Sequence, residues 1–403
     1  MQRLQPVFST YVQRSSRKLK FEDGSTISLD IDVGEIAAGD VSEPICEFEL
    51  ELEGGASERL LDLASEIGKV VPFQLVTRSK AARGYALLTH EEPQPQKYVN
   101  LSLAKGNTVE QVLTELVQHC LDHLRTNEAV VLTTDNLEGV HQMRVALRRL
   151  RAGLRLFRPS LPNDQYDWVV AEAKWLTAEL SAAREWDVFA EEFLAPVAGH
   201  YEEDQGFDSL AAVVGQARQQ SRQRARDAIR TKRYLEFLLR LSAWRSGQAW
   251  RNQPERERTI RLLDPIGEDC VRLLNKRHRN VRKQGQDIAE LPEAGLHDLR
   301  LAIKRLRYTA DFFEGLYPRK KVNAYRKHLV VLQDQLGYLN DVAAVERLLR
   351  ELAGAGRDQA PSAWVYAGGV TVGWHHHAAI VAKQRLGKDM AAFLRIDPFW
   401  HEA

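Results

Sequence analysis

Cysteine is scarce in this chain of 403 residues, and its three positions form no motif. Cys46, Cys120 and Cys270 are odd in number, lie far apart and match no metal-ligand spacing. This argues against a disulfide framework or a zinc site and fits a reducing compartment. Long apolar runs are also missing, since no stretch reaches the ~18–20 apolar residues that span a bilayer, and the first twenty residues form no signal core. We therefore expect a soluble, cytoplasmic protein with no membrane partner.

Several motifs of catalysis and of nucleic-acid binding are missing as well. The sequence contains no glycine-rich loop that would cradle a phosphate and no serine or cysteine nucleophile motif. It shows neither a helix–turn–helix nor a zinc-finger pattern. A binding function therefore stands ahead of a nucleophilic enzyme.

Charge is balanced overall but unevenly distributed. The net charge is +1, with 44% hydrophobic and 28% charged residues, a composition that argues against wholesale disorder. Residues 1–92 carry ten Lys/Arg against sixteen Asp/Glu, whereas residues 93–403 carry forty-six against thirty-nine. An acidic front and a basic back suggest two tasks or two partners.

The first 90 residues have the pattern of a β domain. Residues 25–32 and 46–53 alternate polar and apolar side chains, which predicts strands. We expect turns at Asp23-Gly24 and at Val33-Gly34-Glu35. A helix over 56–68, then a strand and a short helix between 73 and 88, would complete the domain. The polar, proline-punctuated residues 91–104 are predicted to be a linker.

Beyond residue 105 the apolar residues recur with a helical period. The predicted fold class is α+β and mainly α, with a helical domain over 105–403. The predicted helices cover 107–132, 136–158, 163–193, 207–230, 232–246, 259–283, 295–314, 320–350 and 361–386.

An internal repeat organises this helical domain. Residues 140–162, VHQMRVALRRLRAGLRLFRPSLP, align without a gap with residues 296–318, LHDLRLAIKRLRYTADFFEGLYP, at an offset of 156 residues. The matching apolar positions follow a 3,4,3,4,3 spacing, which predicts a buried seam in a helical bundle. They are Val140, Met143, Leu147, Leu150, Leu154 and Phe157 in the first copy, and Leu296, Leu299, Ile303, Leu306, Ala310 and Phe313 in the second.

A row of basic residues accompanies the seam in each copy. One residue step rotates a helix by ~100°, so each row borders the buried face rather than opposing it. A solvated helix face usually mixes acids with bases at i,i+4, yet no acid occupies these positions. The first row is His141, Arg144, Arg148, Arg151 and Arg155, and the second is His297, Arg300, Lys304 and Arg307.

The composition of the rows indicates a phosphate ligand. Arginine stays protonated and offers a planar fork that suits phosphate oxygens, and a row of such groups favours an extended phosphate chain over a small anion. Two further stripes are less specific, and a solvated face explains them equally well. They are Arg272, Lys276, Arg279 and Lys283, and Arg218, Arg222, Arg226, Arg230 and Arg233.

These residues resemble a known family, the CHAD domain, or conserved-histidine α-helical domain. The resemblance is carried by His141-Gln142-Met143-Arg144 with Arg148-Arg149-Leu150-Arg151, by their echo from His297 to Arg307, and by Leu339-Asn340-Asp341 and Pro398-Phe399-Trp400. It implies two pseudo-symmetric four-helix bundles around a basic central surface that binds inorganic polyphosphate. The positions that match the family's binding residues are His141, Arg144, Arg148, Arg151, His297, Arg300, Lys304 and Arg307; Arg155 and the stripe from Arg272 to Lys283 are extensions from spacing.

The front of the chain is similar to the second half of a CYTH domain, the triphosphate tunnel metalloenzyme fold. The similarity rests on Leu29-Asp30, Gly34-Glu35-Ile36, the alternation from Glu47 to Glu51, and Ser79-Lys80 with Arg83-Gly84-Tyr85. It implies a truncated antiparallel β tunnel, because the family's opening Glu-x-Glu-x-Lys strand does not precede Phe8. Glu47, Glu49 and Glu51 share one strand face and are candidate ligands of Mg²⁺ or Mn²⁺ in a completed tunnel, with a solvent-facing strand as the alternative.

Three functions follow, in order of preference. In the first, the protein binds inorganic polyphosphate without a cofactor and associates with polyphosphate granules. The second is an inorganic triphosphatase whose missing front part is supplied, and the third is a nucleic-acid binder, which the lack of aromatics in the rows makes less favoured. A metal at His141 and His297 is disfavoured because the neighbouring arginines repel a dication, and the run His375-His376-His377 is expected at the surface.

Overall fold

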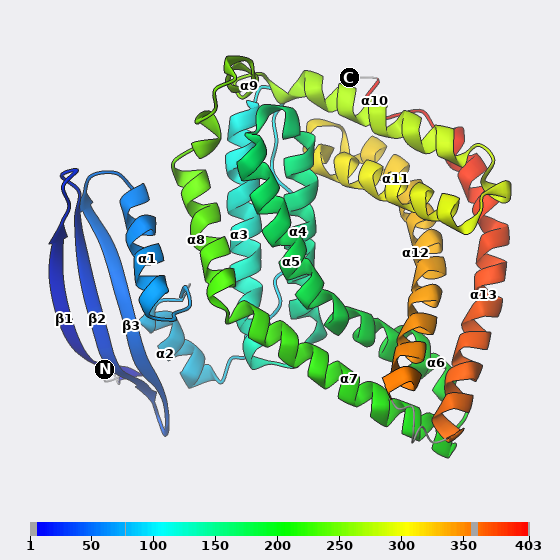
Figure 1. The fold of residues 1–403 in the computed structure, drawn as a ribbon, viewed down its shortest axis with the longest axis horizontal. Coiled ribbons are helices and arrows are strands. Elements are labelled where there is room, and N and C mark those ends of the chain that lie inside the picture. The colour runs from blue at the N-terminus through cyan, green and yellow to red at the C-terminus, as the bar shows by residue number, and fades with distance from the viewer. Residues whose placement is uncertain (1–5, 77, 356–361, 402–403) are drawn as a thin grey trace, which may run out of the picture.

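The computed structural model describes residues 6–76, 78–355 and 362–401. It confirms a mainly α-helical protein with a small antiparallel sheet at its front (Figure 1). The front part comprises β1 (Ser9–Lys20), β2 (Thr26–Ala38), β3 (Val41–Gly54), α1 (Glu58–Val70) and α2 (Lys80–Thr89). The strands lie in the order β1-β2-β3.

One predicted turn of the sheet is wrong. β2 continues through Gly34 without a break, and the chain reverses instead at Gly39, whose φ is +61°. A Cβ on Gly34 would lie 1.9 Å from the carbonyl oxygen of Tyr11 in β1. Glycine is therefore required there by the close approach of a neighbouring strand and not by a turn.

The strand predicted after residue 73 is also wrong, since the described residues there form none before α2. Phe73 stacks edge-on against Phe48 of β3 at 4.9 Å between ring centroids. Leu75 packs against buried residues of the helical body. The alternating apolar side chains are thus used for packing across layers and not for pairing at a sheet edge.

The helical part follows the predicted pattern closely. The predicted helix over 259–283 is split at Pro265. Proline disrupts the interior of a helix because it has no N–H to donate, and Pro265 lies directly before α10. The end of the predicted helix over 163–193 is a π-helical turn at Phe189–Leu194. The helices are α3 (Val109–Thr133), α4 (Leu137–Leu156), α5 (Asn163–Val188), α6 (Ala195–Ala198), α7 (Gln205–Ile229), α8 (Lys232–Ser246), α9 (Arg256–Arg261), α10 (Ile266–Gly285), α11 (Glu293–Phe312), α12 (Arg319–Ala355) and α13 (Ser362–Leu394).

The duplication extends well beyond the repeated motif. The helices α3, α4, α5 and α7 begin at residues 109, 137, 163 and 205, and α10, α11, α12 and α13 begin at 266, 293, 319 and 362. Each pair is therefore separated by 156 or 157 residues. The two four-helix units meet where α4 contacts α11 and where α7 contacts α13, and together they form a frame (Figure 1). α8 follows the first unit.

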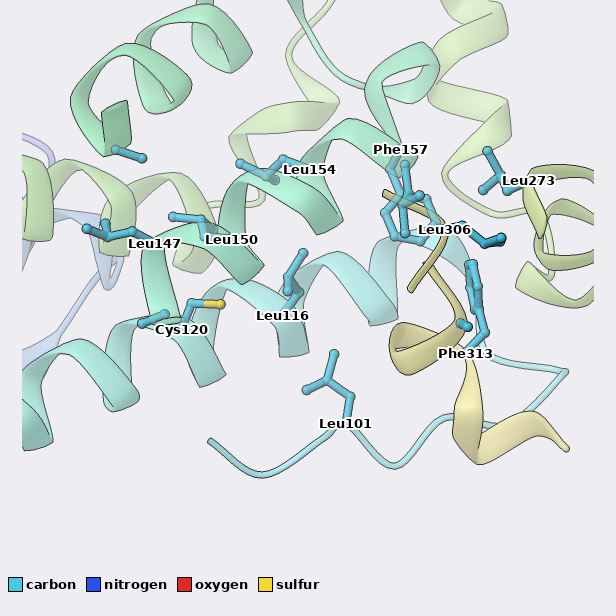
Figure 2. Close-up of a cluster of buried hydrophobic side chains, with 14 of the residues drawn as sticks. Leu101, Leu116, Cys120, Leu147, Leu150, Leu154, Phe157, Leu273, Leu306 and Phe313 are labelled. Atoms are coloured by element: carbon cyan, nitrogen blue, oxygen red, sulfur yellow. The ribbon is translucent and has the colours of Figure 1, made fainter. Parts of the chain in front are cut away.

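The predicted seam is the centre of the main core. All twelve of its residues are buried, and Figure 2 shows several of them from both copies packed with Leu101, Leu116 and Cys120. α3 and α4 approach so closely that a Cβ on Gly153 would lie 2.3 Å from Leu116. Full burial of each large apolar side chain stabilises the fold by roughly 1.5–3 kcal/mol, so the seam fixes the rotation of α4 and α11 about their axes.

The predicted linker is packed against the helical body. Leu101 and Leu103 are buried in the main core, and the backbone N–H of Gln96 donates to the side chain of Asn127 in α3 at 3.0 Å. The sheet itself reaches the body through α1, where Ala64 packs in a small buried cluster with Leu235 and Leu239 of α8. Within the described residues, no helix combines the length and apolarity needed to cross a bilayer.

Candidate functional site

A cavity of about 320 Å³ lies between α4, α10 and α11, where the two units meet. Of the described residues that line it, eight are arginine or lysine and none is aspartate or glutamate. α4 contributes most of them, so the first predicted row faces the cavity almost entirely. The basic residues are Arg144, Arg148, Arg149, Arg151, Arg155, Arg277, Lys304 and Arg305.

The α4 row is held at the edge of the core with few partners. Arg144 donates to the hydroxyl of Ser181 and, at 3.4 Å, to the carbonyl oxygen of Thr177, both neutral acceptors on α5. The buried Nε atoms of Arg148 and Arg151 have no hydrogen-bond partner among the described residues. Buried donors without an acceptor are costly, so the described part of the protein leaves these two guanidinium groups only partly satisfied.

The pKa values of the cavity's basic side chains are also shifted downward. Burial, followed by the neighbouring charge of Arg148, lowers the pKa of Arg144 to about 10. Burial also lowers the pKa of Arg148 and of Arg151. The pKa of Lys304 falls to about 8, because it is buried and because Arg148 and Arg300 lie near it. In all four groups the site disfavours the charged form, and the pKa values of Arg144 and Lys304 still lie above 7.

The second predicted row is only partly brought to the cavity. Lys304 lines it, whereas His297 is exposed and lies outside the lining. Arg307 donates its Nε–H to Gln333 at 2.7 Å and lies 4.0 Å from Asp311. His141 and Arg300, both half-buried, flank the cavity without lining it. Burial lowers the pKa of His141.

The stripe predicted on α10 does not reach the cavity. Arg272, Lys276, Arg279 and Lys283 are all exposed, because they lie on the side of the helix opposite its buried residues such as Leu274. Arg272 is paired with Asp269. α10 instead presents Arg277, which is half-buried and close to the buried side.

Sequence reasoning also missed other residues of the cavity. Arg149 lies with its guanidinium 4.0 Å from the ring centroid of Tyr98, and it donates to Asn100 at 2.8 Å. Arg305 and Tyr308 of α11 line the cavity too. Arg149, Arg305 and Tyr308 each directly follow a residue of one of the two rows in the sequence. That position was the signal that could have identified them. Nothing in a single sequence indicated that Tyr98 would fold back onto α4.

Four of the five arginines of the basic stripe in the middle of the chain are paired with acids. Arg218 and Arg222 donate to the buried carboxylate of Asp187 at 3.1 and 2.9 Å. Arg226 pairs with Asp135 at 2.8 Å, and Arg233 pairs with Glu172 at 2.7 Å. These four arginines pair with acids on other segments. By contrast, no acid lines the cavity beside the α4 row among the residues that the structure describes.

The histidine run was predicted at the surface, and for its first member this is wrong. His375 is buried on α13 and lies 2.8 Å from the hydroxyl of Tyr338 and 2.9 Å from the carbonyl oxygen of Phe193 in the π-helical turn. This face of α13 packs against that turn, so His375 bridges two helices. His376 is exposed and lies 3.3 Å from Glu346.

The carboxylates of the sheet form a second charged group. Oxygens of Asp32, Glu47 and Glu49 lie within 4.8 Å of one another, and Glu51 is not part of this group. The ammonium of Lys80 on α2 lies 2.8, 2.5 and 2.7 Å from these three carboxylates in turn. A hydrogen bond from Arg14 lowers the pKa of Asp32 to about 2. Arg14 also pairs with Asp32 and Glu49, and Arg83 pairs with Glu47. Since cations of the chain itself already neutralise the carboxylates, the group as folded does not fit Mg²⁺ or Mn²⁺.

The fold and the cavity define a class of helical proteins with a duplicated four-helix unit around a basic centre. A CHAD domain family model matches residues 115–350, more than half of the chain, and the chain therefore belongs to the CHAD family. The solved CHAD domain from the plant Ricinus communis has 28% sequence identity and a TM-score of 0.64, covering 76% of this chain and 98% of that one. PptA from Streptomyces chartreusis shares the fold, with 16% identity, a TM-score of 0.50 and coverage of 71% and 100%.

Two curated relatives extend the comparison. An uncharacterized protein of Mycobacterium tuberculosis is 27% identical over 281 residues, or 66% of this chain and 50% of that protein. The inorganic triphosphatase of Haemophilus influenzae is 37% identical over 84 residues, or 21% of this chain and 24% of the enzyme. This second match falls in the N-terminal region and is consistent with a partial CYTH domain. The chain thus spans about half the length of the first relative and about a quarter of the enzyme.

Proposed function

We propose that this protein binds inorganic polyphosphate in the cavity between α4, α10 and α11. The observation that supports this most is the group of eight basic residues lining the cavity with no acid among the described lining residues. Most cations in folded proteins pair with acids when they are partly buried. Here the compensating charge must come from a ligand or from solvent ions.

The shape of the row favours a chain of phosphates over a single one. Arg144 and Arg155 are eleven residues apart on one helix, which places them roughly 16 Å from each other. A polyphosphate repeats its anionic units along such a length, so that successive guanidinium groups meet successive phosphates. Guanidinium forks bind phosphate oxygens through two parallel hydrogen bonds.

Charge reversal at two half-buried positions of the cavity tests the proposal. In the double variant Arg148→Glu with Lys304→Glu, each lost charge-assisted hydrogen bond removes about 1.5–3 kcal/mol of binding free energy. We expect the Kd for long-chain polyphosphate, measured by calorimetry, to rise by at least a hundredfold. The melting temperature without ligand reports whether the fold is retained.

A matched control is available on α10. Arg272→Glu with Lys276→Glu makes the same change in net charge on an exposed face outside the cavity. We expect this variant to change the Kd by only a few-fold, through long-range attraction. Equal losses in the two double variants would show that polyphosphate binds to the general surface, and no loss in the first would remove the cavity from the proposal.

Competition separates polyphosphate from nucleic acid as the partner. Long-chain polyphosphate should displace single- and double-stranded oligonucleotides at matched salt, because its phosphates can lie along the basic row of a cavity of about 320 Å³ without bases that must also be accommodated. The affinity should fall steeply with salt as condensed counterions are released. In cells, such a protein would be recruited to polyphosphate granules in the cytoplasm, and loss of co-localisation in the cavity variant would test this.

We do not extend the proposal to triphosphate hydrolysis. The similarity to an inorganic triphosphatase covers only a quarter of that enzyme. The carboxylates of Asp32, Glu47 and Glu49 are already bound by Lys80. The sheet as folded therefore lacks free metal ligands among these three residues.

A further inference from the structure

The two copies of the repeat differ at several positions that line the cavity, and the largest change in side-chain size is at Tyr308. At the offset of 156 residues, Tyr308 of α11 corresponds to Ala152 of α4, and both residues line the cavity. The cavity is therefore asymmetric, although the helices around it are duplicated. The larger side chain stands on the α11 side.

The ring of Tyr308 lies among cations from both copies. The guanidinium carbon of Arg148 is 5.2 Å from the ring centroid, the ammonium of Lys304 is 6.0 Å from it, and the guanidinium carbon of Arg307 is 5.4 Å from it. The face of an aromatic ring attracts a cation through its quadrupole. The ring thus stabilises three like charges that would otherwise repel one another.

The hydroxyl of Tyr308 is buried and has no hydrogen-bond partner among the described residues. Other buried tyrosines of the helical body use their hydroxyls. That of Tyr234 donates to Glu128 at 3.1 Å, and that of Tyr325 lies 2.7 Å from His278. A buried hydroxyl without a partner is unfavourable. Because Tyr308 also lines the cavity, a ligand bound there is the nearest source of an acceptor that the described residues do not supply.

The charges on the two sides of the cavity differ as well. Asp311 occupies the position in α11 that Arg155 occupies in α4. Its carboxylate lies 3.2 Å from Arg326 and 4.0 Å from Arg307, and therefore neutralises part of the second copy. The α4 side keeps its full positive charge, while the α11 side contributes Lys304, Arg305 and a neutral hydrogen-bond donor.

We propose that Tyr308 is the positioning and specificity residue of the cavity. Its ring holds Arg148 and Lys304 in place, and its hydroxyl donates a hydrogen bond to a phosphate oxygen of a chain that lies against α4. This inference rests on the proposed polyphosphate function. Because the hydroxyl is uncharged, it adds affinity and fixes the path of the anion without releasing a counterion.

The test is a salt titration of the variant Tyr308→Phe, which keeps the ring and removes only the hydroxyl. The Kd for long-chain polyphosphate is measured by calorimetry between low and moderate salt. A hydrogen bond to a charged group predicts that the Kd rises by about tenfold to a hundredfold. The slope of log Kd against log salt should stay at the wild-type value, whereas Arg148→Gln should lower that slope because it removes a charge.

Two further variants complete the design. Tyr308→Leu removes the ring as well and should bind more weakly than Tyr308→Phe, since the cations lose the face that holds them. Tyr366→Phe removes the hydroxyl of an exposed tyrosine on α13 and should leave the Kd unchanged.

The possible results separate the two proposals. No binding of polyphosphate by the wild type would overturn the proposed function itself. Wild-type binding with an unchanged Kd in Tyr308→Phe would overturn the role of Tyr308 alone. A lowered salt slope in Tyr308→Phe would also overturn it, because the variant would then have lost ionic contacts and not a neutral donor.

Discussion

The buried ammonium of Lys304 should destabilise the protein while it serves the ligand, and the variant Lys304→Met measures this cost. Methionine keeps an unbranched apolar side chain of similar length and removes the charge. Burial, with the nearby Arg148 and Arg300, lowers the pKa of Lys304 from 10.5 to about 8. Since each pH unit corresponds to about 1.4 kcal/mol, the charged side chain costs the folded state roughly 3 kcal/mol at pH 7.

The dependence on pH has a definite sign. The folded pKa lies below the unfolded one, so the unfolded chain holds the proton more tightly and the stability of the wild type rises with pH between about 8 and 10.5. Below pH 8 the full penalty is present. At pH 9.5 it has shrunk to about 1 kcal/mol. The methionine variant lacks this dependence.

Urea unfolding at pH 7 and at pH 9.5 is the assay. We expect Lys304→Met to exceed the wild type in free energy of unfolding by roughly 3 kcal/mol at pH 7 and by far less at pH 9.5. Lys276→Met, at an exposed position on α10, should show neither difference. A gap that is absent at pH 7, or that persists undiminished at pH 9.5, would refute the description of Lys304 as a strained cation.

Three further predictions concern other charged or crowded positions. Arg222→Ala should lower the free energy of unfolding by about 1–3 kcal/mol, because the buried Asp187 loses one of two partners, while the Kd for polyphosphate stays unchanged; a weakened Kd would argue against a purely structural role. Lys80→Ala with Arg14→Ala should create a Mn²⁺ site that calorimetry detects and that the wild type lacks, and equal binding by both proteins would show that these two cations do not block the carboxylates. Gly34→Ala should melt the sheet before the helices, since its Cβ would collide with a backbone oxygen of Tyr11, and a single unchanged melting transition would speak against that close approach.

The helices and the buried seam could be predicted from the sequence because both depend on local periodicity. Residues such as Leu147 and Leu306 repeat at helical spacing, and their burial fixes which way the basic residues beside them face. Arg148 and Lys304 were found at the cavity for this reason. The direction of a basic row can therefore be predicted only where the buried face of its helix has been identified correctly.

Other features depend on tertiary contacts that no spacing encodes. The stripe on α10 was as regular as the row on α4, but it lies on the side of α10 that faces away from the core. Arg277, and not Arg279, therefore reaches the cavity. The acid beside Arg307 is instead a local one, because Asp311 follows it by four residues on the same helix, so the sequence did contain that signal. Gly34 has the sequence signature of a turn and the structural role of a contact between strands.

The segment that joins the sheet to the helices has a practical consequence for dissecting the protein. Tyr98 lines the cavity and stacks on Arg149, and Asn100 accepts a hydrogen bond from the same guanidinium. A fragment trimmed to the first long helix would lose this piece of wall and free Arg149 to move. The cavity therefore needs residues that precede the first helix of the helical domain. A shortened protein intended for ligand measurements should start before Gln96.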